Sequence, residues 1–154
     1  FNIDKEGLIV TNAHLADHAG TIRVYFQSGP PYSGAVTALF PEVDLALIKI
    51  AGEDLPVLET APQSEPQTGD TVTVVGNPLG FSHIAVEGTV MGRTTPAGWN
   101  DPVLLDAPIH EGNSGSPVFN SEQKVIAVVF ATAAKDFAEE NMVGLAVPIH
   151  HVYK

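Results

Sequence analysis

Short apolar segments, separated by turn residues, follow one another along almost the whole of this 154-residue chain. Most of these segments are rich in Val, Ile and Leu, whose side chains suit extended backbone and the surface of a pleated sheet. The chain also contains 14 Gly and 12 Pro, which interrupt long helices and supply the turns between short strands. The pattern therefore predicts an all-β protein.

We expect the strands to form two groups with a connection between them. The turn at residues 4–7 predicts a hairpin between the first two strands. Residues 53–70, rich in Pro, Glu and Gln, indicate the connection, so that residues 1–52 form the first half and residues 71–154 the second. The expected strands are residues 1–3, 8–11, 21–27, 33–40 and 45–50 in the first half, and residues 71–75, 83–93, 103–107, 116–120, 125–131 and 142–147 in the second.

Composition argues against several classes of partner. The chain carries 18 acidic and seven basic side chains, a formal net charge of −11, whereas nucleic-acid binding needs a basic face. No apolar run approaches the roughly 18 residues of a membrane-spanning helix. There is no cysteine, so the fold does not depend on disulfides. We expect neither a nucleic-acid partner nor a membrane segment.

The most distinctive motif is EGNSGSP at residues 111–117, directly before an apolar segment. It places Ser114 in a tight turn between Gly112 and Gly115. A serine hydroxyl is a weak nucleophile, so catalysis by it needs a neighbouring base and donors for the negative charge that develops on the substrate. The glycines allow the backbone to bend so that neighbouring N–H groups point at one oxyanion.

Two upstream motifs supply partners for such a serine. The segment VTNAH ends on His14, a candidate base, and DLALIK begins with Asp44, a candidate carboxylate to orient it. Each residue alone has a plainer interpretation: a turn serine, a surface or core histidine, a residue that starts a strand. Their joint occurrence in the order His, Asp, Ser, one of the known chain orders of a catalytic triad, favours catalysis. The α/β-hydrolase elbow G-x-S-x-G is excluded, because Ser116 stands where its last glycine belongs.

With these motifs the chain resembles the chymotrypsin-like (trypsin-fold) serine proteases, and among them the bacterial HtrA/Deg branch. The resemblance implies two six-stranded antiparallel β-barrels, with His14 and Asp44 from the first and Ser114 from the second. The matching segments lie in order along nearly the whole chain: GLIVTNAH at 7–14, DLALIK at 44–49, GNPLG at 76–80, EGTV at 87–90, LDAPI at 105–109, the serine turn, and VGLAVP at 143–148.

The same resemblance implies roles for further residues. The backbone N–H groups of Gly112 and Ser114 would form the oxyanion hole. The pocket for the side chain before the scissile bond (P1) would be lined by the residue five before the serine and by the strand that follows it. These positions are Ile109, Val129, Phe130, Ala131 and Thr132. Their side chains are small or apolar, which favours a small or medium aliphatic P1 residue.

The serine turn itself is more similar to that of the bacterial glutamyl endopeptidases, because HtrA proteins usually carry glycine at the position of Ser116. Those enzymes meet the substrate carboxylate with a histidine on the strand after the serine, and Val129 holds that place here. Burying an unpaired carboxylate against Ile109 and Val129 would be strongly unfavourable. Pocket chemistry therefore favours the aliphatic preference.

The resemblance also frames the whole protein. HtrA relatives have a further strand before the position of Phe1, usually carry a PDZ domain after the protease, and often form trimers through N-terminal segments. We therefore expect a first barrel without its first strand and no PDZ domain in this chain. We also expect a homo-oligomer formed through parts outside it. We expect a polypeptide substrate, an extracytoplasmic location, no cofactor and no metal site. The alternative is a latent or inactive trypsin-fold module that binds proteins.

Overall fold

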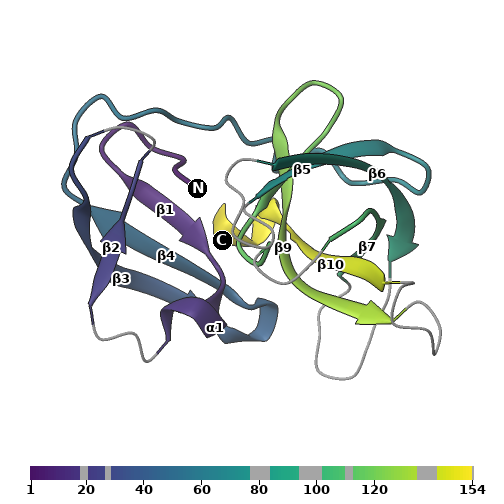
Figure 1. Ribbon diagram of the computed structural model, residues 1–154, viewed down its shortest axis with the longest axis horizontal. Coiled ribbons are helices and arrows are strands. Elements are labelled where there is room, and N and C mark those ends of the chain that lie inside the picture. The colour runs from purple at the N-terminus through teal and green to yellow at the C-terminus, as the bar shows by residue number, and fades with distance from the viewer. Residues whose placement is uncertain are drawn as a thin grey trace. The chain divides into compact units, whose positions relative to one another are not determined.

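A computed structural model describes residues 1–17, 21–26, 29–76, 84–93, 102–109, 113–134 and 142–153. The chain divides into two compact units, unit 1 (Phe1–Leu58) and unit 2 (Glu59–Lys154). Strands dominate both units (Figure 1). Each unit is described by itself.

Unit 1 is built on a four-stranded antiparallel sheet with the order β1-β4-β3-β2. The register places Val10 opposite Leu47 and Val36 opposite Ile48. These strands match four of the five expected ones, because their apolar side chains recur at the spacing of a half-buried sheet. The expected strand at residues 1–3 is instead a single bridge at Asn2. Their bounds are Leu8–Thr11 (β1), Ile22–Val24 (β2), Tyr32–Phe40 (β3) and Leu45–Ile50 (β4).

The predicted hairpin at the start of the chain is present. Asn2 forms an antiparallel bridge with Ile9, and the turn between them closes through a hydrogen bond from Gly7 N–H to the Asp4 carbonyl at 2.9 Å. Gly7 has φ +101°, and a Cβ there would also lie closer than 3.0 Å to Ile50. Only glycine satisfies both conditions without strain.

The described residues contain three short helices that were not predicted from the sequence. They are α1 (Ala13–Ala16) and the 3₁₀ helices η1 (Pro41–Val43) and η3 (Ile149–Tyr153). The strand pattern gives no signal for helices this short, although Asn12 before α1 and Pro41 at the first position of η1 are typical start residues. Two of these turns carry or adjoin the candidate catalytic residues of unit 1.

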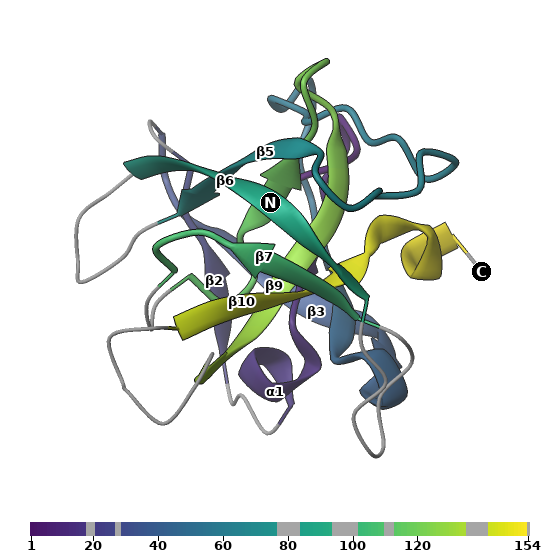
Figure 2. The ribbon, with the colours of Figure 1, turned by 90° about the vertical axis from the view of Figure 1, so that its right-hand side faces the viewer.

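Unit 2 is a closed antiparallel barrel with the strand order β10-β7-β6-β5-β8-β9 (Figure 2). All six expected strands of the second half are present, so the predicted six-stranded barrel is confirmed for this unit. The strands are Thr71–Gly76 (β5), Ile84–Arg93 (β6), Val103–Asp106 (β7), Pro117–Phe119 (β8), Val125–Ala134 (β9) and Met142–Pro148 (β10).

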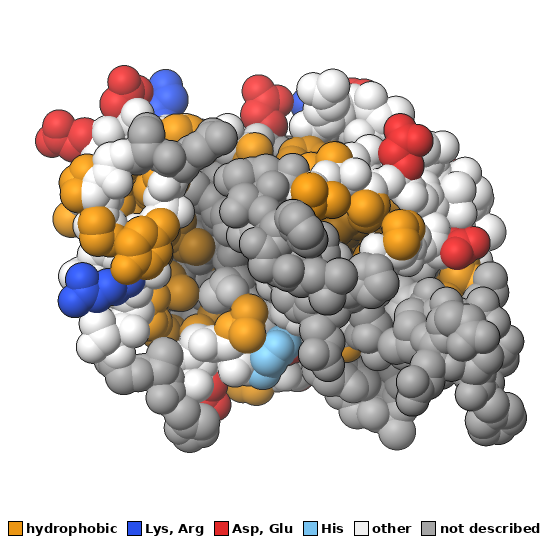
Figure 3. Space-filling view, in the orientation of Figure 1, with side chains coloured by type: hydrophobic (Ala, Val, Ile, Leu, Met, Phe, Trp, Pro, Cys, Tyr) orange, Lys and Arg blue, Asp and Glu red, His pale blue; other side chains and the backbone are white. Residues whose placement is uncertain are grey.

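The two units differ in how completely they bury their apolar side chains. The barrel of unit 2 encloses a cluster that includes Val72, Leu105 and Val118, each at most 1% exposed. The cluster of unit 1 centres on Ile48 and Ile50 and is completed by partly buried side chains. Exposed apolar side chains, coloured orange, are visible on the face drawn in Figure 3.

No helix in the described part of the chain is long and apolar enough to cross a membrane.

Candidate active site

Asp44 occupies a strained position at the end of η1, directly before β4. Its backbone is left-handed, with φ 53° and ψ 45°, and its N–H donates to the Pro41 carbonyl at 3.3 Å. This conformation is uncommon outside glycine, and Asp and Asn tolerate it better than most residues. In this turn the Asp44 side chain is only 10% exposed.

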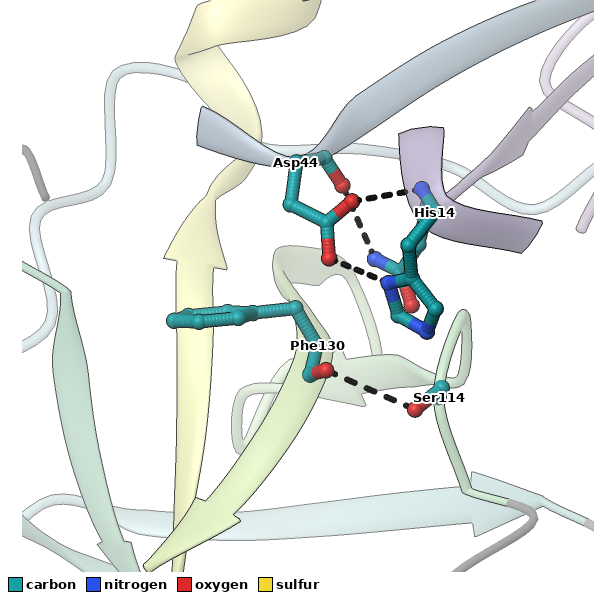
Figure 4. A network of polar contacts seen from close by, with 5 residues as sticks. His14, Asp44, Ser114 and Phe130 are labelled. Carbon is teal, nitrogen blue, oxygen red and sulfur yellow. Dashed lines mark hydrogen bonds and ion pairs between the residues drawn. The ribbon is translucent and has the colours of Figure 1, made fainter. Parts of the chain in front are cut away.

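His14 lies in α1 and meets both oxygens of this carboxylate (Figure 4). The His14 backbone N–H donates to Asp44 Oδ1 at 2.8 Å, and the ring Nδ1–H donates to Oδ2 at 2.5 Å. Because Nδ1 keeps its proton and donates it in a hydrogen bond to the carboxylate, the other ring nitrogen, Nε2, is the acceptor of a neutral imidazole. The His14 side chain is 48% exposed, so its ring is oriented by Asp44 and still reached by solvent.

Ser114 lies in unit 2, in a turn closed by a hydrogen bond from Ser116 N–H to the Asn113 carbonyl at 3.0 Å. Gly115 occupies the third position of this turn with φ +85°, as the glycine-rich motif requires. The turn is tied to β9 by a bond from Gly115 N–H to the Val129 carbonyl at 2.8 Å and a second, at 3.0 Å, from Val129 N–H to the Ser116 carbonyl. The serine therefore projects from a turn fixed by backbone bonds.

Both polar groups of Ser114 are lightly engaged. The hydroxyl lies 3.5 Å from the Phe130 carbonyl, a long hydrogen bond (Figure 4) that would be given up at little cost. Within the described part of the backbone, no carbonyl accepts a hydrogen bond from the Ser114 N–H. Gly112, the other predicted oxyanion donor, lies outside the described residues.

The predicted pocket residues form one region of unit 2. Ile109 and Val129 are 2% and 1% exposed and belong to the same core cluster. Ile109 packs on Gly144, where a Cβ would lie closer than 3.0 Å to its Cδ1 atom. Phe130 is buried, Ala131 is half-buried, and both continue β9 beyond Val129. The last predicted pocket residue, Thr132, pairs through its backbone with Gly144.

Two structural contacts beside these residues were not foreseen from the sequence. Asn12 is fully buried and its Nδ2 donates to the Asp44 carbonyl at 3.1 Å. Gly76, the last residue of β5, lies against the serine turn: a Cβ at this position would come closer than 3.0 Å to Asn113 Oδ1 and to Ser116 Oγ. All five residues of these two contacts lie in the sequence motifs. The local signals are that Asn12 is typical of a helix start and that Gly76 is the first glycine of GNPLG, and neither signal names the partner.

No group of three or more His, Cys, Asp or Glu side chains within the described ranges is arranged to hold a metal ion. The chemistry available to these residues is that of an oriented imidazole in unit 1 and a turn hydroxyl in unit 2. Such groups serve acyl transfer, in which a hydroxyl attacks a carbonyl with the help of a base.

Comparison with known proteins agrees with this chemistry. The family described as the trypsin-like peptidase domain matches residues 1–128. The putative serine protease HhoB of Synechocystis sp. is 32% identical over 156 residues, covering 97% of this chain and 36% of HhoB. The probable periplasmic serine endoprotease DegP-like of Chlamydia trachomatis is 34% identical over 132 residues, covering 83% of this chain and 27% of that protein. The chain thus spans only about a third of these relatives.

Solved structures of similar fold cover nearly the whole chain. The HtrA-type protease AlgW with a tripeptide superposes with a TM-score of 0.87 and 26% identity, covering 99% of this chain and 52% of AlgW. AlgW with a decapeptide gives a TM-score of 0.86 and 25% identity, with 99% and 48% coverage.

Proposed function

Because the chain belongs to the trypsin-like peptidase domain family, we propose that it is the catalytic part of a serine endopeptidase. Ser114 is the nucleophile, His14 is the general base and then the general acid, and Asp44 orients the imidazole. The observation that carries this proposal is the double contact of Asp44 with the backbone and the ring of His14. A surface carboxylate that met the ring only by chance would not also bind the backbone N–H of the same residue.

In the proposed reaction, Ser114 Oγ attacks the carbonyl carbon of the scissile peptide bond as its proton passes to His14 Nε2. The negative charge on the former carbonyl oxygen is met by the N–H groups of Ser114 and Gly112, each worth about 3 kcal/mol of transition-state stabilisation. His14 then gives the proton to the leaving amine. Water, activated by the same imidazole, releases the acyl group from Ser114 and restores the serine hydroxyl.

The substrate is proposed to be an unfolded or extended polypeptide with a small or medium aliphatic P1 residue. This preference rests on Ile109, Val129 and the β9 segment that follows, none of which offers a charge to a P1 side chain. Each additional methylene that fits such a pocket changes transition-state binding by about 1–3 kcal/mol. The preference is therefore graded.

An extracytoplasmic location is part of the same proposal. It is supported by the relatives from Chlamydia trachomatis and Chlamydia muridarum, which are named periplasmic serine endoproteases. Fractionation of cells that express the complete protein, with an antibody against this chain, tests the location: recovery with cytosolic markers alone would contradict it.

The proposed activity is tested with a serine-directed fluorophosphonate followed by peptide mapping. We expect a covalent adduct on Ser114 in the wild type, and no adduct anywhere in His14→Ala, because the hydroxyl is unreactive without its base. Casein digestion by the same preparations should follow the labelling. A wild type that neither labels nor digests casein would favour the alternative, a latent or inactive module that binds proteins.

A further inference from the structure

Asn12 is placed to control the His14–Asp44 pair of unit 1, although its hydrogen bond in the described structure goes to the backbone of Asp44 and not to the ring of His14 or the carboxylate of Asp44. Its side chain is fully buried. The amide Nδ2 donates to the backbone carbonyl of Asp44 at 3.1 Å, across 32 positions of sequence. Its own backbone carbonyl accepts from the N–H groups of Leu15 and Ala16 at 3.2 Å each. Asn12 thus joins the helix of His14 to the turn of Asp44.

The local sequence predicts a different use for this side chain. Asn12 is the N-cap residue of α1, with extended backbone at φ −88° and ψ 147°, yet it makes no side-chain capping bond. An N-cap asparagine ordinarily accepts an N–H from the second or third helical residue. Here the second residue is His14, and its N–H is taken by Asp44 Oδ1 at 2.8 Å. The carboxylate caps the helix from another part of the chain.

Asn12 and Asp44 have therefore exchanged roles. Asp44 supplies the capping acceptor that Asn12 would normally give, and Asn12 supplies a donor to the Asp44 carbonyl. In the described part of the chain, no protein group donates a hydrogen bond to Asn12 Oδ1, so the amide is held through its Nδ2 donor to Asp44.

The Asp44 carbonyl is the group whose position matters most in this turn. Asp44 is left-handed, a conformation that most side chains avoid and that persists only where the surroundings enforce it. A donor on its carbonyl fixes the peptide that follows and hence ψ of Asp44. If that peptide rotates, the carboxylate swings away from the two His14 groups that it binds.

We propose that Asn12 is a positioning residue, which holds Asp44 in the left-handed conformation that orients the His14 imidazole. This inference rests on the proposed function for its effect on catalysis, but not for its effect on the His14–Asp44 contact. Asn12→Ala should lower kcat on the order of 10- to 100-fold, the scale of a small misplacement of a catalytic group. KM should change little, because Asn12 is buried and does not meet a substrate.

A second variant separates the new role from simple capping. Serine is as good an N-cap as asparagine, but its hydroxyl is too short to reach the Asp44 carbonyl. Asn12→Ser should therefore keep the fold and still lose kcat as Asn12→Ala does. Wild-type kcat in a folded Asn12→Ser protein would overturn the proposal.

The matched control is Asn2, the other asparagine of unit 1 that is buried and donates to a backbone carbonyl, with Nδ2 2.8 Å from Pro56 O. Asn2→Ala should lower the melting temperature and leave kcat of the folded protein unchanged. An equal loss of kcat in Asn2→Ala and Asn12→Ala would show that the effect is only structural and would overturn the proposal.

Two measurements complete the test on the 154-residue chain. In an Asp44→Ala background, Asn12→Ala should not slow labelling of Ser114 by the fluorophosphonate any further, because Asn12 acts through Asp44; additive losses would contradict this. In the proton NMR spectrum, the downfield Nδ1–H resonance of His14 should broaden or vanish in Asn12→Ala and persist in Asn2→Ala. This resonance does not depend on turnover, so the two hypotheses fail separately. An inactive wild type would contradict the proposed function, and an unchanged resonance in Asn12→Ala would contradict the inference about Asn12.

Discussion

The two units hold their candidate catalytic residues by different means. In unit 1, His14 and Asp44 are joined by side-chain contacts across 30 positions of sequence, beside a four-stranded sheet whose apolar cluster is completed by partly buried side chains. In unit 2, the turn of Ser114 is fixed to a closed barrel by backbone hydrogen bonds to β9.

Because of this difference, we expect kcat to be sensitive to different kinds of substitution in the two units. Backbone hydrogen bonds survive most changes of side chain. The serine turn should therefore be displaced mainly by substitutions of glycines at which an added Cβ would push on the turn. Side-chain contacts are lost with a single functional group, so the pair in unit 1 should respond to isosteric changes that leave packing intact.

The largest expected effect is that of Ser114→Ala. Loss of the nucleophile should lower kcat by about 10⁶-fold, as for other serine proteases, while the free energy of unfolding changes by less than about 0.5 kcal/mol. Within the described residues the hydroxyl makes one long hydrogen bond, and the backbone bonds of the turn remain. Casein digestion and thermal unfolding measure both effects; equal digestion by the variant would refute the assignment of Ser114.

Asp44→Asn should have the next largest effect. An amide has one carbonyl oxygen and cannot accept from both the backbone N–H and the ring of His14, so the ring is left in the wrong tautomer or orientation. We expect kcat to fall by about 10⁴-fold. Steady-state kinetics on a peptide substrate measure the change.

Asp54→Asn is the matched control for that variant. Asp54 is in the same unit, is also left-handed with φ 51°, and is exposed. Its substitution should leave kcat unchanged. If Asp44→Asn keeps more than about a tenth of wild-type turnover, Asp44 does not orient His14 in the way required of a triad.

Gly76→Ala should disturb the serine turn of unit 2 without removing a catalytic group. The added Cβ would press on Asn113 Oδ1 and Ser116 Oγ, which flank Ser114 on both sides. We expect a 10- to 100-fold loss of kcat, on the order of a 1 Å displacement of the nucleophile. It should be accompanied by about 1–3 kcal/mol of destabilisation from overpacking.

Gly34→Ala provides the comparison from unit 1. A Cβ at Gly34 would also be crowded, by Ile48 of the apolar cluster, but Gly34 contacts no candidate catalytic residue there. Its variant should unfold at a lower temperature and keep its kcat. If both glycine variants lose stability alike and neither loses kcat, the turn yields elsewhere and Gly76 does not set the position of Ser114.

Much of this molecule is readable from its sequence, for physical reasons. The strands follow from apolar spacing, and the glycine-rich turn follows from the φ that Gly115 must adopt. The one-turn helix α1 was missed, because four residues are too few to show a helical period. The buried bond of Asn12 to Asp44 was missed because it joins residues 32 positions apart, and no local pattern reports the partner of a buried amide.

The smallest expected effect concerns the pocket, where Ile109→Val removes the Cδ1 methyl that lies against Gly144. Loss of one buried methyl group from the barrel core should destabilise unit 2 by about 1 kcal/mol. If Ile109 bounds the pocket, the vacated volume should also shift the ratio of cleavage after Leu to cleavage after Ala by severalfold, on the order of 1 kcal/mol, toward Leu. Cut sites mapped by mass spectrometry in a denatured protein give this ratio.

The same substitution at Ile126 isolates the specificity effect from the loss of stability. Ile126 lies in β9 and belongs to the same buried cluster as Ile109, but was not expected to line the pocket. Ile126→Val should cost similar stability and leave the ratio of cut sites unchanged. Equal shifts in both variants would show that the barrel core as a whole determines the shape of the pocket. A dominant Glu, Lys or Arg at P1 in the wild type would show that Ile109 and Val129 do not form the pocket. A shift confined to Ile109→Val would show that the Cδ1 methyl group of Ile109 contributes to P1 specificity, separately from the backbone bonds that fix the turn of Ser114.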